Sequence, residues 1–163
     1  MIQSCNSFRH GVNDLMAEIF FYHLADEPLE RILPNLLRRG LERGLRMAVQ
    51  SSSPDSLAKI SELLWAHEDV AFIPHGMNDD AGEHQPLWLC ADQQNPNRAV
   101  YRFFIEGAMP DDVEGLERAL ILFDSNSEEA LASARSEWKK RKAEGHEISY
   151  WKMDENGKWQ NLA

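Results

Sequence analysis

The sequence predicts a single-domain, Rossmann-like α/β fold, a three-layer sandwich with a mostly parallel sheet. Short runs of β-branched and aromatic residues alternate with amphipathic segments of helical period, which is the pattern of successive βαβ units. A chain of 163 residues has the size of one domain, and neither an internal repeat nor a low-complexity linker divides it. We expect the domain to span residues 18–163, with residues 1–17 as an N-terminal extension.

The first βαβ unit shows this pattern most clearly. Residues Glu18–Leu24 are rich in β-branched and aromatic side chains and predict the first strand. Asp26 offers an N-cap oxygen, and Pro28 suits the first turn of a helix, where its missing N–H costs little. Gly44 is the expected helix terminator. The apolar stripe of this helix consists of Leu29, Ile32, Leu33, Leu36, Leu37 and Leu41.

The remaining elements continue the alternation. Further strands are expected at Leu45–Val49, Val70–Ile73, Val100–Ile105, Ala119–Phe123 and Ile148–Met153. Further helices are expected from Pro54 or Asp55, over Asp112–Glu117, and from Ser125–Ser127 to Glu144 with Gly145 as the C-cap. An Asn156-Gly157 turn is expected after the last strand.

Composition and charge exclude several classes of protein. The formal net charge of −10 opposes extensive contact with phosphates, so any contact with DNA is expected to be indirect, through other proteins. The longest apolar runs fall far short of the roughly 20 residues that cross a bilayer. The first fifteen residues lack a secretory pattern, and Cys5 and Cys90 lack metal-type spacing, so we expect a cytoplasmic protein with free thiols.

The strand-to-helix turns lack the glycines of a nucleotide site. Neither His23–Asp26 nor Gln50–Pro54 contains GxGxxG or GxxxxGK[ST]. His67 and His75 lie near one another without HExxH or CxxC, so no metal or other cofactor is expected. The chain also has no GxSxG nucleophile motif. We therefore expect a non-catalytic protein, with a degenerate nucleotide-dependent enzyme as the alternative from another class.

Four short strings occur in order along the chain: Ile19-Phe-Phe-Tyr-His-Leu24, Leu63-Leu-Trp65, Phe72-Ile-Pro-His75 and Tyr150-Trp151-Lys152. In combination they resemble the chi subunit family of bacterial DNA polymerase III, from about Glu18 to about Lys158. The resemblance implies a Rossmann-like fold without a nucleotide site. It also implies a non-catalytic accessory subunit that binds the psi subunit in the clamp-loader assembly and the C-terminal tail of single-stranded-DNA-binding protein. An adaptor that presents the psi surface to a DNA repair helicase is the alternative. Residues 1–17 precede the usual start of the family, and Met16 is an alternative initiator.

Trp65 is the first candidate binding residue. At 100° per residue it points toward the edge of the core stripe of its helix, so it is either partly exposed or packed as core. That stripe consists of Leu57, Ile60 and Leu64. The resemblance implies exposure, because the family uses the aromatic residues matching Trp65 and Phe72 to hold psi.

The second candidate site lies on the last predicted helix. Arg135, Lys139 and Lys142 fall at i, i+4 and i+7 on one stripe, with Leu131 and Trp138 on its apolar side. By themselves these cations fit a solvated face near a helix C-terminus, where positive charge is favoured.

The resemblance gives this helix a binding role. It implies that Arg135, Trp138 and Lys139, together with Lys142, grip the tail of single-stranded-DNA-binding protein, which is acidic and ends in an aromatic carboxylate. Between residues 135 and 142 there are five cations and one anion, Glu137. Leu131 stands where the family can show a further lysine.

Overall fold

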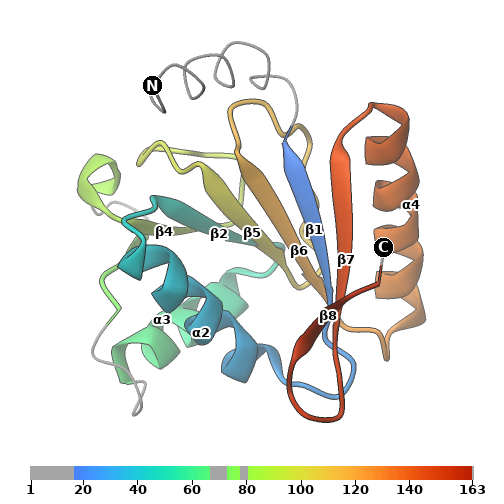
Figure 1. Ribbon diagram of the computed structural model, residues 1–163. Helices are drawn as coiled ribbons and strands as arrows, with labels where there is room; N and C mark the ends of the chain where they lie inside the picture. The colour runs from blue at the N-terminus through green and yellow to red at the C-terminus, as the bar shows by residue number, and fades with distance from the viewer. Residues whose placement is uncertain (1–16, 67–72, 78–80, 163) are drawn as a thin grey trace, which may run out of the picture.

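The computed structural model describes residues 17–66, 73–77 and 81–162, whose strands form one sheet (Figure 1). The strand order is β3-β4-β2-β5-β6-β1-β7-β8, and only β7 and β8 are antiparallel. The strands are β1 (Glu18–His23), β2 (Met47–Ser51), β3 (Gly76–Met77), β4 (Leu87–Cys90), β5 (Tyr101–Ile105), β6 (Arg118–Phe123), β7 (Glu147–Met153) and β8 (Trp159–Asn161). The helices are α2 (Leu29–Glu42), α3 (Pro54–Ala66), α4 (Glu128–Ala143) and the 3₁₀ turn η1 (Gly82–His84). The predicted fold class and its mostly parallel sheet are confirmed.

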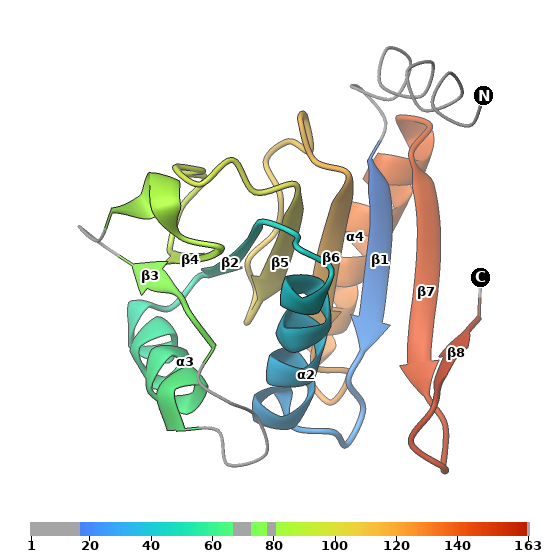
Figure 2. The same ribbon diagram turned by 60° about the vertical axis from the view of Figure 1, so that its left-hand side comes forward.

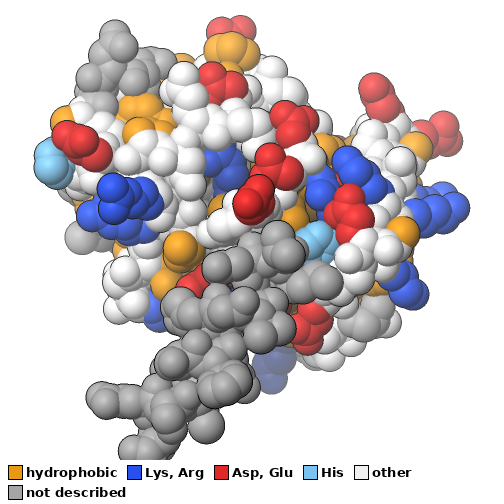
Figure 3. Space-filling model, turned by 90° about the horizontal axis from the view of Figure 1, so that it is seen from above, with side chains coloured by type: hydrophobic (Ala, Val, Ile, Leu, Met, Phe, Trp, Pro, Cys, Tyr) orange, Lys and Arg blue, Asp and Glu red, His pale blue; other side chains and the backbone are white. Residues whose placement is uncertain are grey.

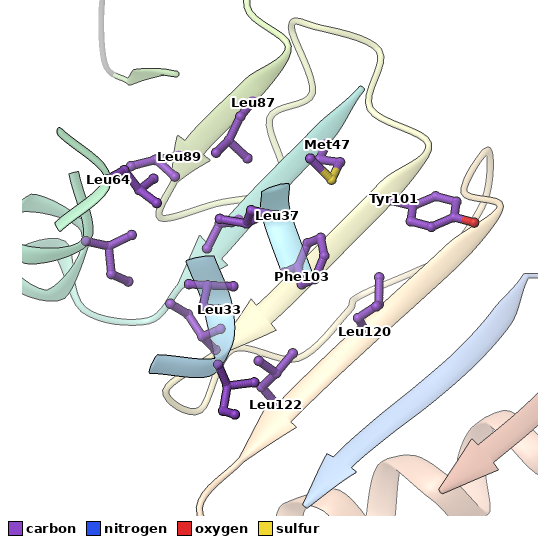
Figure 4. Close-up of a cluster of buried hydrophobic side chains, with 14 of the residues drawn as sticks. Leu33, Leu37, Met47, Leu64, Leu87, Leu89, Tyr101, Phe103, Leu120 and Leu122 are labelled. Atoms are coloured by element: carbon purple, nitrogen blue, oxygen red, sulfur yellow. The ribbon is translucent and has the colours of Figure 1, made fainter. Parts of the chain in front are cut away.

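Helices cover both faces of the sheet and make three layers. α2 and α3 lie on one face, and α4 lies on the other (Figure 1, Figure 2). In the larger apolar cluster, Leu33 and Leu37 of α2 face Phe103 of the sheet (Figure 4). The second cluster lies under α4 and includes Phe21. Because successive side chains of a strand alternate between faces, Phe20 packs with the first cluster and Phe21 with the second.

α2 begins later than predicted. Pro28 is the residue before its first turn, with extended backbone and no side-chain cap, so the predicted N-cap role of Asp26 is wrong. A turn closed by the Glu27 N–H on the Leu24 carbonyl, at 2.8 Å, takes up this segment instead. At the other end Gly44 has φ +73 directly after the C-cap Arg43, and its predicted role as terminator is confirmed.

Two other predicted elements are not found as expected. Residues 70–72 of the predicted strand at Val70–Ile73 lie outside the described residues, and Ile73 is a buried residue that belongs to no strand. The predicted helix over Asp112–Glu117 is wrong: this segment is turns and bends, with Gly115 at φ +79. Val113 and Leu116 are buried in the cluster under α4, so their apolar character reflects packing rather than helix formation.

The chain ends in a hairpin that extends the sheet beyond β7. The Asp154 carboxylate accepts the Asn156 and Lys158 N–H groups at 2.9 Å each, and Gly157 adopts φ +79. The predicted turn at Asn156-Gly157 is therefore confirmed, and it leads into β8, which was not predicted. None of the helices in the described residues combines the length and apolarity needed to span a membrane.

Candidate functional site

Helix α4 presents most of the candidate binding residues, and its ends follow from local sequence. The Ser127 hydroxyl accepts the Ala130 N–H at 3.2 Å and caps the N-terminus, where Glu128 and Glu129 complement the positive end of the helix. Gly145, at φ +89, follows the C-cap Glu144. The predicted long helix is confirmed, and it packs on β6 and β7.

A groove of ≈ 580 Å³ lies between α4 and the sheet, where β6, β1 and β7 run side by side. It lies near the carboxyl ends of β1 and β6, where open parallel sheets commonly bind ligands. Its lining residues are Phe21, His23, Phe123, Ser125, Leu131, Ala134, Arg135, Trp138, Lys139, Tyr150 and Leu162. Thus the structure brings three of the predicted tail-binding residues, Arg135, Trp138 and Lys139, into one groove.

Aromatic rings form the apolar part of the groove. Trp138 lies against Phe21 with ring centroids 5.4 Å apart, and against Tyr150 at 6.1 Å in an edge-to-face arrangement. Tyr150 in turn lies 6.2 Å from Phe123. Rings held by neighbours in this way are pre-organised to receive another apolar or aromatic side chain.

A histidine and a tyrosine add a neutral polar contact to this groove. His23 Nδ1 is hydrogen-bonded to the Tyr150 hydroxyl across β1 and β7. Burial, and then the charge of Lys152, lowers the pKa of His23, so its imidazole is neutral at neutral pH. Burial raises the pKa of Tyr150 against the opposing charge of Arg135, which keeps the phenol protonated. The fixed positive charge at the groove therefore comes from α4.

The five cations of α4 divide into three groups. Arg135 and Lys139 line the groove, whereas Lys140 and Lys142 are exposed on α4 and do not line it. Arg141 is buried at 3% exposure, so the sequence count of five cations overstates the number available to a ligand by one.

Arg141 instead fastens α4 to the rest of the domain. Its guanidinium donates to Glu137 at 2.5 Å and Glu144 at 3.1 Å, and to the carbonyl oxygens of Pro110 at 2.6 Å and Asp111 at 3.2 Å. Burial alone would lower the pKa of Arg141, but the hydrogen bonds and charges of Glu137 and Glu144 together outweigh burial and raise it. Arg141 neutralises Glu137, which is the one carboxylate between residues 135 and 142. The positive charges of Arg135 and the exposed lysines in this range are therefore not offset by a carboxylate from the same range.

Sequence reasoning missed the residues that line the groove outside the basic and apolar stripe of α4, most of which come from the sheet and the segments that follow its strands. The missed residues are Phe21, His23, Phe123, Ser125, Ala134, Tyr150 and Leu162. Strand alternation places Phe21 and His23 on one face, and this signal was available from the sequence. The pairing of β1 with β7, which brings Tyr150 beside them, was not, because nothing local in the chain specifies that neighbour.

Trp65 occupies a separate surface at the end of α3. It is 63% exposed, so the interpretation of Trp65 as core is wrong. Its ring lies 5.8 Å from the His75 ring in an edge-to-face arrangement. His75 is oriented by Ser61 Oγ at Nε2 and by the Ile73 carbonyl at Nδ1, both at 2.8 Å, so Nδ1 carries the proton. Phe72, the other predicted residue of this surface, lies outside the described residues.

Acidic side chains lie at the carboxyl ends of the strands. A hollow at the carboxyl ends of the strands is lined by the carboxylates of Asp26, Glu27, Glu106 and Asp124. At the opposite end of the strands, acidic and basic side chains are mixed over the part of the face that is visible in Figure 3. The described residues hold no group of three or more His, Cys, Asp or Glu side chains arranged to bind a metal.

The family model described as "DNA polymerase III chi subunit, HolC" matches residues 16–149, most of the chain. The chain belongs to the chi subunit family. Chi proteins are accessory subunits of DNA polymerase III, so this chain has an accessory role in DNA replication and associates with that polymerase complex. The groove on α4 and the Trp65 surface are thus two separate surfaces of a chi subunit. No curated protein matches the chain closely.

Proposed function

We propose that this chi subunit is a non-catalytic adaptor that binds the C-terminal tail of single-stranded-DNA-binding protein in the groove on α4. The observation that supports this most strongly is the combination of Arg135 and Lys139 with an aromatic surface in one groove. An acidic peptide that ends in an aromatic residue needs both features at once.

Each part of such a tail has a matching part of the groove. Arg135 grips a carboxylate through two parallel hydrogen bonds, and Lys139 adds a mobile point charge. The terminal ring packs beside Trp138 and Tyr150. Lys142 lies outside the groove and adds attraction at longer range. Because the whole chain carries a charge of −10, this local positive surface, rather than the net charge, must attract the tail.

The proposal extends to the psi subunit through the Trp65 surface. A tryptophan with 63% of its surface exposed is a typical anchor for a protein partner. Trp65 lies at the end of α3, whereas the tail groove is built on α4 and β7, so the adaptor can hold both partners together. A repair helicase is the alternative occupant of the Trp65 surface. Co-purification from native cells, followed by identification of the bound proteins, distinguishes psi from a helicase.

Fluorescence anisotropy with a labelled tail peptide tests the groove. The double variant Arg135→Ala/Lys139→Ala is expected to weaken binding at least about tenfold, since hydrogen bonds to charged groups contribute about 1.5–3 kcal/mol. Raising the salt concentration is expected to weaken binding to the wild type, because the charges are near the surface.

Lys140→Ala is the matched control. It removes the same charge from an exposed position on the same helix, but outside the groove. Lys142→Ala measures the longer-range contribution and is expected to fall between the control and Arg135→Ala. Unchanged affinity in the double variant, or an equal loss in Lys140→Ala, would show that these residues are only a solvated helix face.

A further inference from the structure

Most of the C-terminal hairpin of β7 and β8 lies beyond the residues that match the chi family, yet it contributes to one side of the groove. The family match ends at residue 149, and Tyr150 and Leu162 both line the groove. Leu162 is 60% exposed. Among the described residues, Leu162 and Trp65 are the two large hydrophobic residues that are this exposed. An apolar side chain exposed at the rim of an aromatic groove is placed to be covered by a ligand.

The hairpin fixes the position of Leu162. Met153 pairs with Trp159 and Trp151 with Asn161, and the Leu162 N–H then donates to the Tyr150 carbonyl at 2.8 Å. The turn at Asp154 closes the other end.

The two faces of the hairpin make different contacts. Trp159 packs edge-to-face on Tyr22, with ring centroids 4.9 Å apart, in the cluster on the α2 side of the sheet. Leu162 lines the groove on the α4 side. One face of the hairpin thus anchors it to the domain, and the other presents a leucine opposite the cations of α4.

We infer that Leu162 is a specificity-determining residue of the groove, which packs against the terminal aromatic ring of the bound tail. This inference rests on the proposed function. In the bound complex Arg135 and Lys139 hold the carboxylates from the α4 side, and Leu162 covers the ring from the hairpin side. The hairpin therefore adds selectivity for the terminal residue, on top of the charge selectivity supplied by α4.

The test compares two labelled peptides, the acidic tail with its terminal aromatic residue and the same peptide ending in alanine. Leu162→Ala is expected to weaken binding of the aromatic peptide about 3- to 10-fold, as removal of partly buried methyl groups does. It is expected to leave the alanine-ended peptide almost unaffected. Leu162→Met, which keeps an apolar side chain, is expected to bind the aromatic peptide like the wild type.

Asn161→Ala is the control on the same hairpin. Strand alternation turns its side chain to the face opposite Leu162, so it is expected to bind both peptides like the wild type. Melting temperatures of all variants check that the hairpin stays folded.

The outcomes separate this inference from the proposed function. If the wild type binds the tail and Arg135→Ala/Lys139→Ala weakens it, the proposed function stands. Equal effects of Leu162→Ala on the two peptides would then overturn the role of Leu162 alone. Failure of the wild type to bind the aromatic peptide would overturn both.

Discussion

Removing the buried Arg141 guanidinium is expected to destabilise the domain strongly. Arg141→Met keeps most of the side-chain volume but leaves Glu137, 8% exposed, without its cation. It also removes the donors that reach the carbonyl oxygens of Pro110 and Asp111. Breaking a buried ion pair from one side costs about 3–5 kcal/mol of unfolding free energy. For a domain of this size the loss corresponds to a fall in melting temperature of about 6–20 °C.

Thermal and urea unfolding of four proteins test this expectation. Lys140→Met is the matched control, because Lys140 is exposed on the same helix, and it is expected to melt within about 2 °C of the wild type. The double variant Arg141→Met/Glu137→Leu is expected to recover much of the loss, since no buried charge is then left unpaired. If Arg141→Met alone melted within about 2 °C of the wild type, the assigned role of this ion pair in holding α4 would be refuted.

Three further predictions concern the other surfaces and the turns. Trp65→Ala is expected to weaken psi binding by about 2 kcal/mol or more while keeping the melting temperature of the wild type. The control Leu64→Ala, at a fully buried neighbouring residue, is expected to lose about 2–5 kcal/mol of stability. Loss of folding in Trp65→Ala would contradict the surface role of Trp65. Burial and Lys152 hold the pKa of His23 below its unfolded value of 6.5, so the contribution of neutral His23 to stability is complete above pH 6.5 and is lost as the pH falls through the folded pKa. The melting temperature of His23→Gln should therefore depend less on pH below 6.5 than that of the wild type. Parallel curves of melting temperature against pH for the two proteins would contradict this prediction. Calorimetry with ATP and NAD at millimolar concentration is expected to give no saturable heat, because the strand-to-helix turns lack the glycine-rich phosphate-binding motifs and the hollow beside them is lined by carboxylates. A binding isotherm with a micromolar dissociation constant would contradict the proposal of a non-catalytic adaptor.

Local signals in the sequence predicted the elements that depend on local chemistry. Ser127 caps α4, Gly145 ends it, and the Asn156-Gly157 turn forms where it was expected. The wrong predictions of secondary structure arose where tertiary packing, rather than local sequence, determines the conformation. Val113 and Leu116 have helix-like spacing, but they are apolar because they fill the space under α4.

The same division applies to the groove. Helical periodicity places Arg135, Trp138 and Lys139 together on α4, but by itself it fits a solvated helix face, and only the resemblance to the chi family marked these residues as a candidate site. Arg141 lies in the same run of basic residues, but its burial depends on the carbonyl oxygens of a distant loop, which no local pattern reveals. Tyr150 enters the groove only through the parallel pairing of β1 with β7, which depends on the order of strands in the finished sheet.

The position of β1 between β6 and β7 affects how this chain folds during synthesis. β1 is the first strand of the domain to leave the ribosome, but Arg118, which pairs with Glu18, follows 100 positions later. Tyr150, which bonds to His23, follows 127 positions later. Ile19 and Phe21 of this apolar strand therefore lack the neighbouring strand β6 until residue 118 has been made, and lack β7 until residue 147 has been made. Pairing over such sequence distances is slow and leaves apolar surface exposed while the chain folds. A nascent chain stalled before β7 would contain every basic residue of α4 but would lack Tyr150 and Leu162, which complete the lining of the groove.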